Sequence, residues 1–178
     1  MAPMSEVNSA MSTGPAAGHL WWRWLWLAAA VIVADLATKA WVVAVFREGQ
    51  ELPVTSFFSL VLAYNTGAAF SFLAGAGGWQ RWFFSAIAIA ASVLLVWMLR
   101  RGGSRLLSLG LSLILGGALG NLWDRVTLGR VTDFLLFHYA GWSWPAFNIA
   151  DSAITIGAAC IILDSFTSRR DESPPRAP

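Results

Sequence analysis

Three aspartates lie within one short stretch of a 178-residue chain that is 57% hydrophobic and only 12% charged. They are Asp124, Asp133 and Asp151, and they fall near the last two strongly apolar segments. An ionisable side chain at a bilayer segment is costly to bury, so it commonly marks a catalytic site, an ion path or a paired structural charge. Asp133 enters the apolar run Phe134–Phe137, and Asp151 stands near the start of the last apolar segment. We predict that these two carboxyl groups meet.

A pair of carboxyl groups in contact predicts a particular chemistry. The two cannot both ionise at low cost, so one retains a proton while the other stays charged. The charged member can take a proton from a water that attacks an amide carbonyl, while the protonated member polarises that carbonyl and later protonates the leaving amine. Such a pair indicates an aspartic hydrolase, although it titrates as a unit and the sequence does not assign the proton to either aspartate. The alternative for Asp151 is a helix-start acid favoured by the helix dipole.

Other catalytic chemistries fit the sequence poorly. A zinc peptidase needs several His, Cys or carboxylate ligands, and the two histidines are His19 in an expected tail and His138 in an expected loop. A serine mechanism would need a histidine within a span, or Lys39, which Asp35 is expected to hold charged. Cys160 lies in an apolar run and is expected to be packing material. We therefore expect no metal and no organic cofactor.

Further polar residues occur where lipid could not satisfy them. Asp35 and Lys39 are four residues apart in an apolar stretch, so they share a helix face and can form an ion pair. The segment 65–70 begins with Asn65 and contains Gly67. It indicates either a close approach of the backbone to a ligand or a turn followed by a short helix.

The third apolar segment also ends in small and polar residues. The run Gly116–Gly120 favours close helix packing, because small residues let neighbouring helices touch. Asn121 and the expected Asp124–Arg125 ion pair follow it and must find partners that lipid cannot provide. Asn148 precedes Asp151 by one helical turn, on roughly the same helix face.

Four apolar stretches are long enough to cross a bilayer, so the chain is expected to be an integral membrane protein. They are Leu20–Val43, Trp79–Leu99, Leu106–Trp123 and Ile149–Phe166. We divide the chain into a flexible tail over 1–19, a membrane domain over 20–168 and a second tail over 169–178. The first stretch is expected to be a retained anchor, because it is too long for a signal peptide and lacks a basic leader.

The positions of the arginines predict which side of the membrane each connection between spans faces. Arg100, Arg101 and Arg105 crowd the short second connection, and more arginines follow the fourth span, so both termini are expected to be cytoplasmic. The first and third connections then face outward. In the first, Glu51–Thr55 and Phe57–Leu62 have the composition of short strands, which predicts a small sheet on the membrane surface. The basic residues form no continuous stripe, so nucleic-acid binding is not expected.

Taken together, these motifs resemble those of the bacterial lipoprotein signal peptidases, also called signal peptidase II. The resemblance covers roughly 20–166. It implies an all-α membrane protein with four transmembrane helices, a small extracytoplasmic sheet that cradles substrate, and a short amphipathic helix. It also implies an aspartic endopeptidase of the bacterial inner membrane that removes signal peptides from diacylglyceryl-modified prolipoproteins, cleaving just before the lipidated cysteine.

By the same resemblance, Asp133 and Asp151 are the catalytic pair and Asp124 is a bracing residue. The matching polar positions around the pair are Asp35, Lys39, Asn65, Gly67, Asn121, Arg125 and Asn148. The resemblance further implies contact with membrane lipid and inhibition by cyclic peptides of the globomycin type, and we expect a monomer. A different class remains open, namely a small four-span proton-coupled transporter with Asp35, Asp133 and Asp151 as a relay, or an assembly protein.

Overall fold

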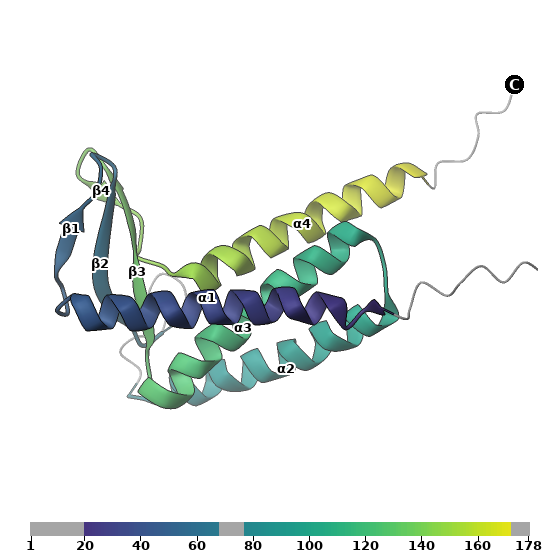
Figure 1. Ribbon diagram of the computed structural model, residues 1–178, viewed down its shortest axis with the longest axis horizontal. Coiled ribbons are helices and arrows are strands. Elements are labelled where there is room, and N and C mark those ends of the chain that lie inside the picture. Colours follow the sequence, from purple (N-terminus) through teal and green to yellow (C-terminus); the bar gives the residue numbers. More distant parts are fainter. Residues whose placement is uncertain (1–19, 68–76, 172–178) are drawn as a thin grey trace, which may run out of the picture.

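The computed structural model describes residues 20–67 and 77–171, with side chains up to 167, and its main feature is four long helices (Figure 1). They are α1 (Arg23–Val45), α2 (Gln80–Arg101), α3 (Arg105–Leu128) and α4 (Ile149–Asp171). All four are long and apolar enough to cross a membrane. The four predicted spans are thus confirmed, with ends that differ by at most five residues.

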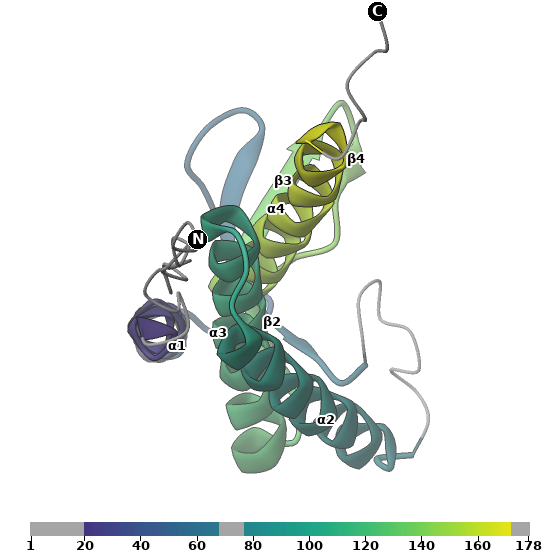
Figure 2. The ribbon, with the colours of Figure 1, turned by 90° about the vertical axis from the view of Figure 1, so that its right-hand side faces the viewer.

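Helix α3 is the centre of the bundle. It packs against each of the other three helices, and Figure 2 shows it between α1 and α2. Its glycines explain the close packing: a Cβ atom at Gly117 would lie 2.3 Å from the carbonyl oxygen of Ala150 in α4. One at Gly116 would lie 2.8 Å from the carbonyl oxygen of Ala28 in α1. The packing role predicted for the run Gly116–Gly120 is therefore confirmed.

A four-stranded antiparallel sheet lies at one end of the bundle (Figure 1). Its strands are β1 (Glu51–Pro53), β2 (Phe58–Asn65), β3 (Val131–Tyr139) and β4 (Trp142–Ser143), in that order across the sheet. Buried Val42 and Phe46 of the α1 end pack against Leu62 of β2 and Phe134 of β3. This apolar contact fixes the sheet against the bundle.

Two of the four strands were not predicted from the sequence. Strands were predicted only in the first connection, whereas β3 and β4 come from the third. The apolar run after Asp133 is therefore part of a strand that pairs with β2, with one irregularity of register between Leu60 and Ala63. His138 lies in that strand, not in a loop, and its Nε2 is 2.9 Å from Oγ of Ser59. The short helix expected after Asn65 falls in 68–76, outside the described residues.

Candidate active site

Asp133 and Asp151 reach the site from different elements. Asp133 lies on β3, paired in register with Ala63 of β2, and is 3% exposed. Asp151 lies in the first turn of α4 and is partly buried. The strand and the helix are joined by the segment 140–148, which returns alongside β3: Phe147 N donates to the carbonyl oxygen of Leu135 at 3.0 Å. The chain path thus brings two acids that are 18 positions apart to one end of the bundle.

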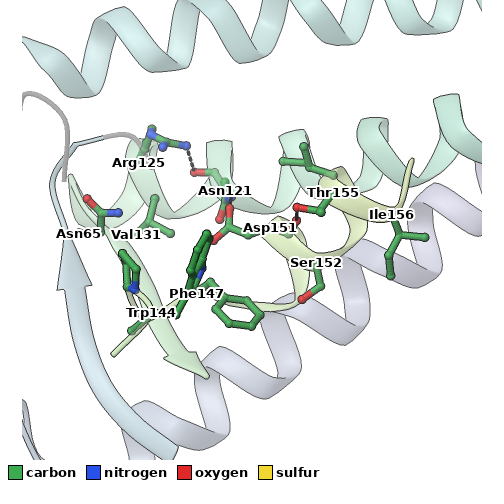
Figure 3. A pocket seen from close by; sticks show the side chains of 13 residues that line it. Asn65, Asn121, Arg125, Val131, Trp144, Phe147, Asp151, Ser152, Thr155 and Ile156 are labelled. Carbon is green, nitrogen blue, oxygen red and sulfur yellow. Dashed lines mark hydrogen bonds between the residues drawn. The ribbon is translucent and has the colours of Figure 1, made fainter. Parts of the chain in front are cut away.

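Asp151 borders a cavity of about 540 Å³ (Figure 3). The lining combines polar groups of α3, α4 and β2 with apolar groups of α4 and of the segment before it. The lining residues are Asn65, Asn121, Arg125, Val131, Trp144, Pro145, Ala146, Phe147, Asp151, Ser152, Ile154, Thr155 and Ile156. Asp133 is not among them, so within the described part of the chain only Asp151 of the two acids faces the cavity directly. The aromatic segment before Asn148 was not predicted to contribute, although its closeness in sequence to Asp151 was a usable signal.

Asn148 connects the two acids. Its Nδ2 donates to Oδ1 of Asp133 at 2.8 Å, and its Oδ1 accepts from the backbone N–H of Asp151 at 2.9 Å. The second contact is a helix N-cap, which satisfies one of the free N–H groups at the start of α4. Asn148 is fully buried, so these bonds do not compete with water. The amide predicted to lie near Asp151 therefore also holds Asp133.

Asn121 holds the carboxyl group of the second acid, Asp151. Its Nδ2 donates to Oδ1 of Asp151 at 2.7 Å, while its Oδ1 accepts from Nζ of Lys39 at 3.0 Å. An ammonium can only donate, so it selects the oxygen end of the amide and leaves the NH₂ end for the carboxylate. Lys39 thereby fixes the orientation of Asn121 with respect to Asp151.

Lys39 lies at the centre of a buried charge cluster. Its Nζ is 2.7 Å from Oδ2 of Asp35 and 3.3 Å from Oδ2 of Asp124. The predicted pair of Asp35 and Lys39 is confirmed, but it does more than anchor one helix. Asp35 accepts from the backbone N–H of Ala150 at 2.9 Å, in the first turn of α4. Asp124 accepts from the backbone N–H of Thr132 on β3, also at 2.9 Å.

The expected Asp124–Arg125 ion pair is wrong. The two residues are consecutive on α3 and point in different directions, and in the described part of the chain the ion-pair partner of Asp124 is Lys39. The Arg125 guanidinium instead approaches the carbonyl oxygens of Asn121, at 3.3 Å, and Gly67, at 3.4 Å. It also lies 5.5 Å from the ring of Phe84. Arg125 thus links α3 to the end of β2.

Asn65 lies beside the pair, and Gly67 follows it at the end of β2. The side-chain oxygen of Asn65 accepts from the backbone N–H of Gly67 at 2.9 Å, closing a tight turn after β2. Asn65 also hydrogen-bonds to the Asp133 carboxyl group. The remainder of that motif, 68–70, lies outside the described residues.

The surroundings of Asp133 favour its protonated form. Burial raises the pKa of its carboxyl group from 3.8 to about 7, and the nearby Asp151 charge acts in the same direction. Hydrogen bonds from Asn148 and Asn65 and the charge of Lys39 act against this shift without cancelling it. Near neutral pH the site therefore holds a carboxyl proton beside a second acid. This arrangement can supply a general acid and a general base for attack of water on an amide.

Known proteins match the part of the chain that contains the four helices and the sheet. A family model described as signal peptidase (SPase) II matches residues 27–167. A lipoprotein signal peptidase of Ralstonia nicotianae is 53% identical over 148 residues, which are 83% of this chain and 86% of that protein. One of Cupriavidus necator is 50% identical over 163 residues, covering 91% and 90% of the two chains.

Solved structures agree with the fold. One bacterial membrane enzyme superposes with a TM-score of 0.78 at 30% identity, covering 88% of this chain and 94% of that one. A second gives a TM-score of 0.70 at 33% identity, covering 79% and 90%. None of these matches supports the transporter or assembly alternatives considered from the sequence. Because the family model spans all four helices and the sheet, and because the relatives match over most of their own length, the chain belongs to the signal peptidase II family.

Proposed function

We propose that this protein is an aspartic endopeptidase that removes signal peptides from diacylglyceryl-modified bacterial prolipoproteins, cleaving just before the lipidated cysteine. Family membership supports the reaction. The observation that carries the proposal is the pair of acids, each held by the amide of a neighbouring asparagine. One of them borders a cavity large enough to admit part of a substrate.

The geometry supports different roles for the two acids. Asp133 is the more deeply buried, and its raised pKa supports it as holder of the shared proton. Asp151 faces the cavity, where a water molecule and the scissile peptide would meet it. Asp151 then removes a proton from the attacking water, and Asp133 polarises the amide carbonyl and protonates the departing amine.

The cavity lining supports a lipidated substrate. Beyond Asp151 the wall consists of Ile154 and Ile156 of α4, and of Trp144 and Phe147 on the opposite side. Ile156 is 56% exposed on the apolar surface of a membrane helix. Acyl chains of the substrate can therefore remain in lipid beside α4 while the peptide bond reaches the acids.

The arginine distribution supports an orientation with both termini in the cytoplasm and the active site at the outer surface of the bacterial inner membrane. The sheet, which lies at the other end of the bundle from the arginine-rich connection, would then cradle the extracytoplasmic part of the substrate (Figure 1). Monomeric function and inhibition by globomycin-type peptides belong to the same proposal. The flexible tails predicted over 1–19 and 169–178 fall outside the described residues, apart from the end of α4.

Mass spectrometry of a diacylglyceryl-modified prolipoprotein incubated with the purified protein tests the reaction and the pair. Cleavage just before the lipidated cysteine is expected from the parent. The variants Asp133→Asn and Asp151→Asn should each lose on the order of 10²–10⁴-fold in rate, because an amide cannot exchange the proton. Asp164→Asn is the matched control, since Asp164 lies on α4 and contacts Ser104 far from the pair. Turnover at the parental rate by either site variant would rule out the pair.

A further inference from the structure

A groove separates α1 from α2 on the face of the bundle away from the active-site cavity. Both helices pack on α3, and Figure 2 shows them diverging on its two sides. The groove has a volume of about 590 Å³. It is lined by Leu25, Ala28, Ala29, Ile32, Ser92, Val93, Val96, Trp97, Arg100, Leu115 and Leu119.

The groove is apolar along its length and basic at one end. Ser92 contributes no free polar group, because its Oγ donates to the carbonyl oxygen of Ala88 at 2.7 Å. Arg100, in the last turn of α2, is the one charged residue in the lining. From Ser92 to Arg100 the helix rises about 12 Å. The shape is therefore that of a slot for an extended apolar chain with a charged terminus.

Arg100 is available to an anion. Its guanidinium lies 5.7 Å from the ring of Trp21, just before α1, so it stands where the two helices close the groove. Among the described residues, no carboxylate lies within ion-pair distance of it. The neighbouring Arg101 differs: it stacks 3.8 Å from the ring of Trp97 and does not line the groove.

We propose that this groove binds one acyl chain of an anionic phospholipid from the surrounding bilayer, with the lipid phosphate at Arg100. Apolar side chains gain little from exchanging one hydrocarbon for another within a membrane, so an apolar groove alone selects no partner. Selection comes from charge complementarity at the end of the groove, as in other basic pockets between membrane helices.

The lipid would also support the active site. Helix α1 carries Asp35 and Lys39, which hold α4 and Asn121, yet α1 lacks extensive packing against α2. A bound acyl chain fills that gap and ties the two helices together. The lipid site does not depend on the peptidase reaction, and cleavage by the parent protein remains a separate measurement.

Native mass spectrometry in detergent tests the site with phosphatidylglycerol and phosphatidylcholine of identical acyl chains. The parent should retain phosphatidylglycerol about fivefold more than phosphatidylcholine, the preference that one basic residue supplies at a membrane surface. Arg100→Gln should abolish this preference, and Arg101→Gln, which removes the same charge one residue away, should preserve it. Equal retention of both lipids by the parent would overturn the proposal, as would equal losses in the two variants.

A second pair of variants tests the slot independently of charge. Ala29→Phe fills the groove and should displace phosphatidylglycerol, whereas Ala30→Phe places the same side chain on an exposed neighbouring position outside the lining. Thermal unfolding with added phosphatidylglycerol should show stabilisation of the parent and of Ala30→Phe only. Stabilisation of Ala29→Phe to the same extent would contradict the proposal, as would a bound mass equal to a second chain.

Discussion

At the scale of single residues, the site depends on which end of each amide faces which acid. Asn121 and Asn148 both present NH₂ groups to the aspartate carboxyl groups, and Lys39 fixes the first of these orientations. The proton on Asp133 belongs to the same description, because burial beside a second acid raises its pKa to about 7. Because the folded protein keeps Asp133 protonated, the free energy of unfolding depends on pH.

We predict that Asp133→Asn removes this contribution to the pH dependence of stability. Folded protein keeps the Asp133 proton up to about pH 7, whereas unfolded protein releases it near 3.8. Unfolding thus releases a proton between these values, and the free energy of unfolding falls as pH rises through this window. Thermal unfolding in detergent at pH 5 and pH 8 should show a decline for the parent and a smaller one for Asp133→Asn, which should be the more stable protein at pH 8. Identical declines in the two proteins would contradict the raised pKa.

At this scale the sequence predicts which polar residues come together, but not all of their connections. The types and order of Asp133, Asp151 and Asn148 predicted a paired-acid site because few polar groups interrupt so apolar a chain. The partner of Asp124 could not be found in the same way. Its nearest cation in sequence is Arg125, but side-chain directions on a helix separate the two, and the actual partner, Lys39, is 85 positions away.

At the scale of elements, Asp124 joins three parts of the fold. It pairs with Lys39 of α1 and accepts from the backbone of Thr132 on β3. We predict that Asp124→Asn lowers stability by about 1–3 kcal/mol, because a buried ammonium loses one of its two carboxylates. Thermal unfolding in detergent measures the loss. Glu48→Gln, which breaks an exposed 3.8 Å pair with Arg130, should have little effect.

The glycines of α3 give a second prediction about elements. Gly117→Ala would push α4 away near Ala150, at the end that carries Asp151, whereas Gly110→Ala would do so near Gly157, well along the helix. Both variants should lose about 1–3 kcal/mol of stability through overpacking. Only Gly117→Ala should also lower the cleavage rate per folded molecule, as activity normalised to the folded fraction would show. Equal specific activities would mean that the α3–α4 contact does not position Asp151.

The elements also explain which parts of the fold were predictable. Helix spans follow from composition over about 20 residues, so all four were found. Strand β3 was missed because its run of Phe and Leu is equally compatible with a helix end, and only pairing with β2 decides between them. A sheet assembled from 51–65 and 131–143 depends on a contact across two spans, which local patterns cannot reveal.

At the scale of the whole molecule, function depends on which side of the membrane carries the sheet. Tyr139 and Trp142 are strongly exposed at the sheet end, as is common for aromatic residues at a membrane–water interface. The opposite end carries Arg100, Arg101 and Arg105, which are expected to stay in the cytoplasm. The polar substrate segment must then approach from outside.

Cysteine labelling of sealed spheroplasts tests this orientation. With Cys160→Ala as background, we predict that Ser143→Cys at the sheet reacts with a membrane-impermeant maleimide in spheroplasts. Thr167→Cys, near the arginine-rich end of α4, should react only after the membrane is opened. Both introduced positions are exposed, so access through the membrane, and not burial, decides the result. Labelling of Thr167→Cys alone in sealed spheroplasts would reverse the orientation and put the acid pair on the cytoplasmic side, where a translocated substrate could not reach it.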